Sequence, residues 1–252
     1  MSNPYLVGHG PHHVIVVHGW FGSASAWEPF AHVVDGERFT YAFLDCRGYG
    51  DRKAHPGPFT MEAIAEDVIA LADALGWSQF HLMGHSMGGK AIQQVLHLAP
   101  QRVSSLIAVT PVPASGVPFD DATWALFDSA AANPQARAGI INHSTGNRLS
   151  PHWVQQIAKH SLEQSTVEAF AGYLPSWVRG DLSAGLQGLP QPTLVIVGEH
   201  DPGLTADVMR ATYLQLYPNA QLHTVGNAGH YPMDETPVAL ATVMESFIAS
   251  LP

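Results

Sequence analysis

The sequence predicts an α/β fold, in which a mostly parallel sheet carries helices on both faces. Short apolar runs bounded by turn residues alternate along the chain with segments of helical periodicity, which indicates repeated strand–helix units. The runs are almost continuously apolar, as expected of strands that are buried on both faces. With 252 residues, 46% of them hydrophobic, the chain is long enough to bury a large core.

Six short apolar runs are the predicted strands. In an open parallel sheet, ligands bind beyond the carboxyl ends of the strands, so the residues that follow each run are the candidates for a functional site. The runs are Val14–His18, Tyr41–Leu44, Phe80–Met83, Leu106–Val109, Thr193–Val197 and Leu222–Val225.

Two helices are predicted from their start signals and their periodicity. Thr60 precedes a segment whose apolar residues recur every three or four positions. These residues are Met61, Ile64, Val68, Leu71 and Leu75. Near the C-terminus, Thr236 and Pro237 provide an N-cap and a first-turn proline for a helix that runs to about Ser250. Its predicted core face is Leu240, Val243, Met244, Phe247 and Ile248.

The stretch 113–189 interrupts the alternation of strands and helices. It shows no convincing strand but several helical segments, one of them opened by Ser150 and Pro151 and covering His152–His160. We expect a helical cap inserted over the carboxyl edge of the sheet, with 1–112 and 190–252 forming the core domain. Helices that continue the α/β layering are the alternative. The aromatic residues of the stretch are Phe119, Trp124, Phe127, Trp153, Phe170, Tyr173 and Trp177.

The charge balance argues against two classes of partner. The chain has 11 basic and 21 acidic residues, a formal net charge of −10 with neutral histidines. An acidic chain without clusters of lysine and arginine repels phosphate backbones and anionic lipids, so we expect neither nucleic acid nor a membrane surface as a partner. No apolar run approaches the roughly 20 residues that span a bilayer.

Three further features concern location and metal binding. The N-terminus has no basic region before an apolar stretch, and the single Cys46 fits a reducing compartment. We therefore expect a cytoplasmic protein, a monomer or homodimer, although a mature exported chain without its leader would look the same. No Cys or carboxylate lies beside His9, His12 and His13, so no metal site is predicted there.

The turn after Phe80–Met83 places one serine among glycines, in the sequence GHSMGG. A sharp strand-to-helix turn requires little side-chain bulk, and it would lift the Ser86 hydroxyl above the sheet at the positive end of the next helix. Serine is a poor nucleophile without a base, so the interpretation of Ser86 as a nucleophile depends on a histidine and an acid elsewhere.

The loops that follow the last two predicted strands contain an acid and a histidine. Asp201 follows the first of these strands, and His230 lies in the loop after the second. Each of the three residues follows a different strand, so Ser86, His230 and Asp201 can meet at one edge of the sheet. Glu199 lies in the same loop as Asp201 and is the alternative acid.

Acyl transfer also needs hydrogen-bond donors for the oxyanion. The backbone N–H of Met87, directly after the serine, is one candidate. The N–H of Trp20 is the other, because Gly19 and Gly22 allow that strand-end loop to fold against a ligand.

Four residues beside these loops receive a structural interpretation. We expect His18 and His85 to pack or form hydrogen bonds within their own turns. Cys46 has no obvious base partner and is expected to be a small packing residue. We expect Arg47 to pair with a carboxylate below the sheet edge and not to contact substrate.

Five motifs in this order, HGWFG, DCRGYG, GHSMGG, GEHD and NAGHYP, make the sequence resemble the α/β-hydrolase superfamily, in its branch with a helical cap. The resemblance covers the chain outside the insertion. It implies an eight-stranded, mostly parallel sheet whose first strands lie before and around Val14. It also implies Ser86 as nucleophile, His230 as base and Asp201 as acid. Relatives that dehalogenate or open epoxides carry Asp in place of Ser86, which disfavours those reactions.

The predicted function is therefore a serine carboxylesterase that cleaves small apolar esters with water and needs no cofactor. Some aromatic side chains of the cap should face the site, so an aromatic or medium-chain ester fits better than a charged one. The predicted substrate-binding residues are Phe21, Trp124, Phe127, Trp153, Trp177 and Tyr231. The same triad leaves open carbon–carbon bond hydrolysis, lactone hydrolysis, perhydrolysis, cofactor-free oxygenation or a slow-turnover ligand sensor.

Overall fold

The computed structural model describes residues 5–251, in which seven strands form one sheet of order β1-β3-β2-β4-β5-β6-β7. Strand β1 pairs antiparallel with β3, and all other pairs are parallel. The strands are β1 Tyr5–Gly8, β2 His12–Val17, β3 Phe39–Leu44, β4 Phe80–His85, β5 Val103–Val109, β6 Thr193–Gly198 and β7 Ala220–Val225. All six predicted strands are present, each extended by one to three residues at one end, except that β2 also ends one residue before the predicted His18.

The expectation of eight strands is wrong for the part of the chain that the structure describes. Two strands do lie before and around Val14, as expected, but the chain between β2 and β3 forms the short helices η1 (Ala24–Trp27) and α1 (Glu28–Ala31) and adds no further strand. The sheet remains mostly parallel, with its one antiparallel strand at an edge.

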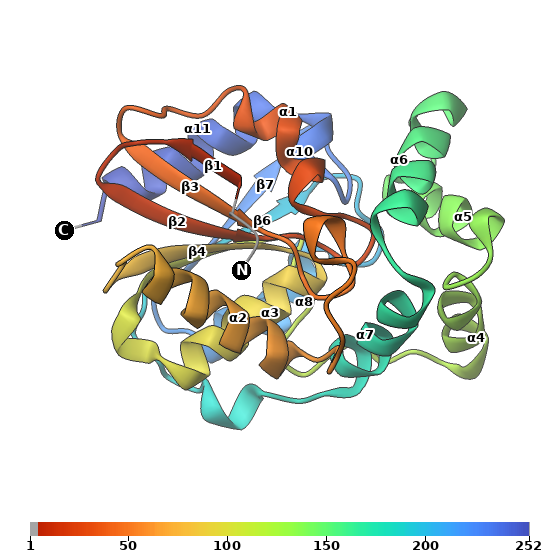
Figure 1. The fold of residues 1–252 in the computed structure, drawn as a ribbon, viewed down its shortest axis with the longest axis horizontal. Helices are drawn as coiled ribbons and strands as arrows, with labels where there is room; N and C mark the ends of the chain where they lie inside the picture. The colour runs from red at the N-terminus through yellow and green to blue at the C-terminus, as the bar shows by residue number, and fades with distance from the viewer. Residues whose placement is uncertain (1–4, 252) are drawn as a thin grey trace.

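Helices cover both faces of this sheet (Figure 1). Helices α1 and α11 (Pro237–Ala249) lie on one face, and α2 (Met61–Ala74) and α3 (Met87–Leu98) lie on the other. The remaining helices of the core are α8 Ala206–Ala211, α9 Tyr213–Leu216 and α10 Pro232–Glu235, with the short η2 Gly50–Arg52 and η3 Pro100–Arg102.

The two predicted helices begin where their start signals indicated. The Thr60 hydroxyl accepts a hydrogen bond from the Ala63 N–H at 3.2 Å, so it caps α2 as expected. Thr236 occupies the N-cap position of α11 but its side chain makes no capping bond. Its backbone is bent away from the capping geometry (φ −147°, ψ 55°), because the chain arrives directly from α10. The predicted core face of α11 is buried, except for a half-buried Val243.

Between 113 and 189 the chain forms helices and no strand. They are α4 Asp121–Ser129, α5 Pro134–Ser144, α6 Pro151–Gln164, α7 Val167–Arg179 and the short η4 Ser183–Gly185. The Ser150 hydroxyl caps α6 by accepting from the Trp153 N–H at 3.2 Å. Helices α4–α7 stand together at the end of the sheet where the parallel strands finish (Figure 1). We refer to 113–189 as the helical insertion.

Candidate active site

Ser86 lies in a strained turn between β4 and α3. Its φ of 53° and ψ of −115° are unusual for a residue with a side chain, and such strain persists only where the surroundings fix it. The Ser86 N–H donates to the Val109 carbonyl at 3.0 Å, and the Ser86 carbonyl accepts from the N–H groups of Gly89 (2.9 Å) and Val112 (3.0 Å). Three backbone hydrogen bonds therefore fix the turn.

Two glycines of the motif are required by close backbone approaches. A Cβ on Gly84 would lie 2.3 Å from the Gly88 carbonyl oxygen, and one on Gly88 would lie 2.5 Å from the carbonyl oxygen of Val17 in β2. A side chain at either position would push α3 away from the sheet beneath it.

His230 and Asp201 meet beside this turn. His230 Nδ1 donates to Asp201 Oδ2 at 2.6 Å, and the side chains are 12% and 3% exposed. Asp201 Oδ1 also accepts from the N–H groups of Gly203 (2.9 Å) and Leu204 (3.0 Å). Burial alone would raise the pKa of Asp201, but the charge of His230, its hydrogen bond and the two N–H groups together hold that pKa below its usual value. An ionised Asp201 keeps the proton on Nδ1 and leaves Nε2 as the basic atom.

Glu199, the alternative acid, lies outside this arrangement. Its side chain is 56% exposed, stands 3.6 Å from His200 and accepts from the Asn227 N–H at 3.1 Å. The hydrogen-bonded partner of His230 is therefore Asp201.

The two histidines beside the site have different roles in the structure. His18 bonds within its own turn as expected: Nδ1 donates to the Gly19 carbonyl at 2.7 Å, while Nε2 accepts from the Cys46 N–H at 3.0 Å. His85 instead reaches across the site, where its Nε2 donates to the His230 carbonyl at 2.7 Å. Burial lowers the pKa of both rings, so they are neutral at pH 7.

Cys46 and Arg47 behave as the sequence indicated. Cys46 is buried, and burial raises the pKa of its thiol, so it is not a thiolate at neutral pH. Arg47 forms a two-pronged ion pair with Asp67, with both N–O distances at 2.9 Å.

The two candidate oxyanion donors have free N–H groups. Within residues 5–251, no hydrogen bond occupies the backbone N–H of Trp20 or of Met87, the first residue of α3. The Gly19 backbone packs so closely that an added Cβ would lie 2.5 Å from His85 Nδ1 and 3.2 Å from the Ser86 Cβ. The Trp20 ring is fixed by stacking on Phe170, with 3.8 Å between the ring centroids.

A cavity of about 210 Å³ opens on Ser86, Asp201 and His230. Four of the six predicted substrate-binding residues line it: Phe21, Phe127, Trp177 and Tyr231. The other lining side chains are mainly apolar, and sequence reasoning did not single them out as contacts. They include Val112, Val117, Phe119, Leu126, Ile140 and Leu204.

Trp124 and Trp153 do not line this cavity. The Arg179 guanidinium lies over the Trp124 ring, 3.6 Å from its centroid. Trp153 packs its ring against Tyr231 at 5.7 Å, outside the lining. Among the other aromatics of the insertion, Phe170 and Tyr173 are buried in the core.

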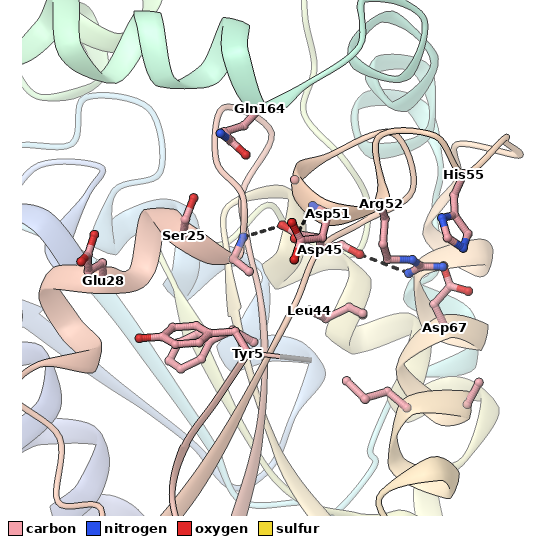
Figure 2. A pocket seen from close by; sticks show the side chains of 15 residues that line it. Tyr5, Ser25, Glu28, Leu44, Asp45, Asp51, Arg52, His55, Asp67 and Gln164 are labelled. Carbon is pink, nitrogen blue, oxygen red and sulfur yellow. Dashed lines mark hydrogen bonds and ion pairs between the residues drawn. The ribbon is translucent and has the colours of Figure 1, made fainter. Parts of the chain in front are cut away.

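A larger cavity, of about 620 Å³, lies away from the serine, on the side of η1, η2 and α2 (Figure 2). Three of its charged side chains, Asp45, Arg52 and Asp67, are bound to neighbours. Asp45 accepts from the N–H groups of Ala24 (2.7 Å) and Asp51 (3.0 Å), and Arg52 lies 2.9 Å from Asp67. None of the three candidate catalytic residues lines it.

Lys90, four residues after Ser86, ties α3 to the insertion. Its side chain is fully buried, and Nζ donates to the carbonyls of Trp177 (3.0 Å) and Gly180. Burial lowers the pKa of Lys90 to about 8. A lysine of α3 thus binds the C-terminal end of α7.

The N-terminal histidines are spread over separate contacts. His9 lies 3.3 Å from Glu37, and His13 stacks on Trp77 with 4.3 Å between centroids. Within residues 5–251, no group of three or more His, Cys, Asp or Glu side chains is placed to hold a metal ion. None of the helices in this range has the length and apolarity needed to cross a membrane.

Comparison with known proteins identifies the family. A family sequence model described as alpha/beta hydrolase fold matches residues 12–237. The chain is 27% identical to the pimeloyl-[acyl-carrier protein] methyl ester esterase of Serratia marcescens, over 97% of this chain and 96% of that protein. It is 28% identical to the 2-hydroxymuconate semialdehyde hydrolase of Pseudomonas putida, over 80% of this chain and 73% of that protein.

A solved structure agrees with these similarities. The thermophilic esterase of Thermogutta terrifontis, solved with malate bound, is 25% identical and superimposes with a TM-score of 0.84, covering 98% of this chain and 92% of that one. These relatives are esterases and another hydrolase, which supports a hydrolase. Since the family match spans most of the chain, the protein belongs to the α/β-hydrolase fold family.

Proposed function

We propose that this protein is a serine carboxylesterase with the triad Ser86, His230 and Asp201. One observation carries the proposal: the 2.6 Å hydrogen bond from His230 to a buried Asp201 lies at the same cavity as the strained Ser86. The unoccupied N–H groups of Trp20 and Met87 add the donors that acyl transfer needs.

The proposed reaction has two steps. His230 Nε2 takes the proton from Ser86 Oγ, which attacks the ester carbonyl, and the N–H groups of Trp20 and Met87 bind the oxyanion. The protonated ring then gives its proton to the leaving alcohol. Water, deprotonated by the same ring, then attacks the acyl-enzyme carbonyl, and the ring returns that proton to Ser86 Oγ as the acid is released. Asp201 fixes the ring tautomer and stabilises its charged form.

No hydrogen bond joins His230 to the Ser86 hydroxyl within the described residues. This is compatible with the mechanism, because catalytic hydrogen bonds are often long in ligand-free sites and shorten when substrate binds.

The cavity favours a small apolar substrate. Its volume of about 210 Å³ and its aromatic and aliphatic lining suit an aromatic or medium-chain acyl or alkyl group. We propose that 113–189 acts as the cap over a core of 1–112 and 190–252, since Phe127, Ile140 and Trp177 of the insertion contribute to the lining.

Turnover of p-nitrophenyl butyrate tests this proposal. We expect saturable hydrolysis by the wild type and only background hydrolysis by Ser86→Ala. A fluorophosphonate should label the wild type at Ser86 in a one-to-one ratio and fail to label the variant. Undiminished hydrolysis by Ser86→Ala would contradict the assignment of the nucleophile.

Carbon–carbon bond hydrolysis is the second candidate. It is favoured by the similarity to the 2-hydroxymuconate semialdehyde hydrolase of Pseudomonas putida and would use the same triad. The candidate reactions are separated by comparing kcat/KM values over a panel of substrates. The panel contains esters, lactones and ring-cleavage products, and perhydrolysis is assayed with a carboxylic acid and hydrogen peroxide. Tight binding of a panel compound without turnover would instead indicate a slow-turnover sensor.

A further inference from the structure

The backbone of His230 is held on both sides. Its N–H donates to the carbonyl of Ser144, at the end of α5 in the insertion, over 3.1 Å. Its carbonyl accepts from His85 Nε2 at 2.7 Å and from the Thr110 hydroxyl at 3.0 Å. These bonds come from three different segments, so the position of the His230 backbone depends on all of them.

One carboxylate binds the residues directly before and after His230. Glu235, at the end of α10, accepts from the N–H of Gly229 through Oε2 (2.8 Å) and from the N–H of Tyr231 through Oε1 (2.9 Å). The residues before and after His230 are thus bound to the two oxygens of one side chain. That side chain is 1% exposed, so water does not compete for these bonds.

The charge partner of Glu235 comes from the insertion. Arg148 lies between α5 and α6, and its guanidinium donates to Glu235 Oε2 and, at 2.8 Å, to the Asn227 carbonyl. An ionised carboxylate buried to this degree is strongly unfavourable without such a partner. This ion pair also destabilises the fold in one respect, because Arg148 Nε is buried and has no hydrogen-bond acceptor within residues 5–251.

The backbone of the insertion also touches the histidine loop directly. A Cβ on Gly229 would lie 2.6 Å from the Thr145 Cα and 3.1 Å from the Ser144 carbonyl oxygen. The chain after α5 therefore packs against the loop at a separation that only glycine permits. With the Arg148 ion pair, the insertion contacts the loop on both sides of His230.

We propose that Glu235 is a positioning residue for His230, and that Arg148 makes this positioning depend on the insertion. This inference rests on the proposed function, in which His230 must transfer protons between Ser86 and the substrate. A ring displaced by about 1 Å costs on the order of 100-fold in rate, so the bonds that fix residues 229–231 contribute to kcat. Neither side chain touches the reacting atoms.

Three variants and a matched control test the proposal. Glu235→Gln removes the charge and one of the two acceptors, Arg148→Met removes the partner, and the double variant removes both charges together. Asp67→Asn is the control, because Asp67 is also a largely buried carboxylate, 13% exposed and paired with arginines, but it lies at the larger cavity away from Ser86 (Figure 2). All four are compared with the wild type in Tm, kcat and KM for p-nitrophenyl butyrate.

We expect kcat of Glu235→Gln to fall about 10- to 100-fold, with KM changed by less than about twofold. The end point of fluorophosphonate titration should equal one per chain while its rate falls, which separates a displaced ring from a fraction of unfolded protein. The double variant should regain Tm over Arg148→Met, because no unpaired charge remains buried, and yet keep the low kcat.

The control sets the outcome that overturns the proposal. Asp67→Asn should lower Tm and leave kcat within about twofold of the wild type. If kcat follows Tm across all four variants, or recovers in the double variant, Glu235 and Arg148 stabilise the fold and do not position His230.

An activity-independent signal separates this proposal from the proposed function. The His230 Nδ1 proton, hydrogen-bonded to Asp201, should give a far-downfield NMR resonance, assigned by its loss in His230→Gln. We expect it to shift or broaden in Glu235→Gln and to remain unchanged in Asp67→Asn. If the wild type hydrolyses no ester, the proposed function fails, and this resonance still decides the positioning of His230.

Discussion

His85 Nε2 donates to the carbonyl of His230 at 2.7 Å, so the residue before the candidate nucleophile helps to hold the candidate base. Burial lowers the pKa of His85, which leaves the ring neutral with its proton on the donating nitrogen. The bond therefore does not depend on pH near neutrality.

Loss of this donor should slow the reaction. We expect His85→Phe to reduce kcat about fivefold, corresponding to a net hydrogen-bond contribution of about 1 kcal/mol, whereas His85→Gln keeps a donor and should lose less. Steady-state kinetics with p-nitrophenyl butyrate measures both. Equal losses in the two variants would show that ring packing, not the hydrogen bond, is what matters.

The acid should be identified by a pair of substitutions in one loop. Asp201→Asn removes the charge that fixes the His230 tautomer, and we expect kcat to fall by roughly 10⁴-fold. Glu199→Gln should remain near wild-type activity, because that side chain is 56% exposed and does not contact His230. The reverse ranking of kcat would reassign the acid to Glu199.

Lys90 should make stability depend on pH in the alkaline range. The folded protein releases this proton near pH 8, whereas an unperturbed lysine holds it to about pH 10.5. Between these values the unfolded chain binds more protons, so the free energy of unfolding contributed by Lys90 rises with pH, by on the order of 3 kcal/mol. Chemical denaturation from pH 7.5 to 10.5 should show a shallower rise in Lys90→Met, and identical slopes would refute the prediction.

Gly88→Ala tests the close packing of α3 against β2. The added Cβ would lie 2.5 Å from the Val17 carbonyl oxygen, so we expect a large fall in Tm and loss of ester hydrolysis together. Gly139→Ala is the comparison in thermal stability, and activity is not compared because Gly139 lines the cavity at Ser86; nothing lies within 4 Å of its Cβ position in α5. It should raise the free energy of unfolding by about 0.5–1 kcal/mol, because alanine favours a helix. Equal thermal melts of the two variants would contradict the steric explanation.

The parts predicted well from sequence are those encoded locally. Apolar runs placed six of the seven strands, and the residues after them brought Ser86, Asp201 and His230 to one cavity, because parallel strands end at the same edge. The choice between Asp201 and Glu199 as the partner of His230 is not fixed by local sequence. Two neighbouring carboxylates in one loop differ only in the direction that the folded loop gives each side chain.

The parts that sequence did not reveal depend on packing between distant segments. Trp124 and Phe127 lie one helical turn apart in α4, and only the packing of α4 decides that Phe127 lines the cavity while Trp124 lies against Arg179. Glu235 precedes the start signal of the predicted C-terminal helix and was not singled out from the sequence. Its partner Arg148 lies 87 residues earlier, and no local pattern relates the two.

The contact between Gly229 and the chain after α5 limits how the helical insertion can be exchanged between members of this family. A chimaera that receives another relative's insertion inherits a new wall for the cavity and also a new surface against the loop that carries His230. Exchange of 113–189 as a block should therefore fail unless the incoming segment supplies a backbone carbonyl for the His230 N–H and a cation for Glu235. Under the proposed function, the segment that lines the cavity is also the one that positions the candidate base.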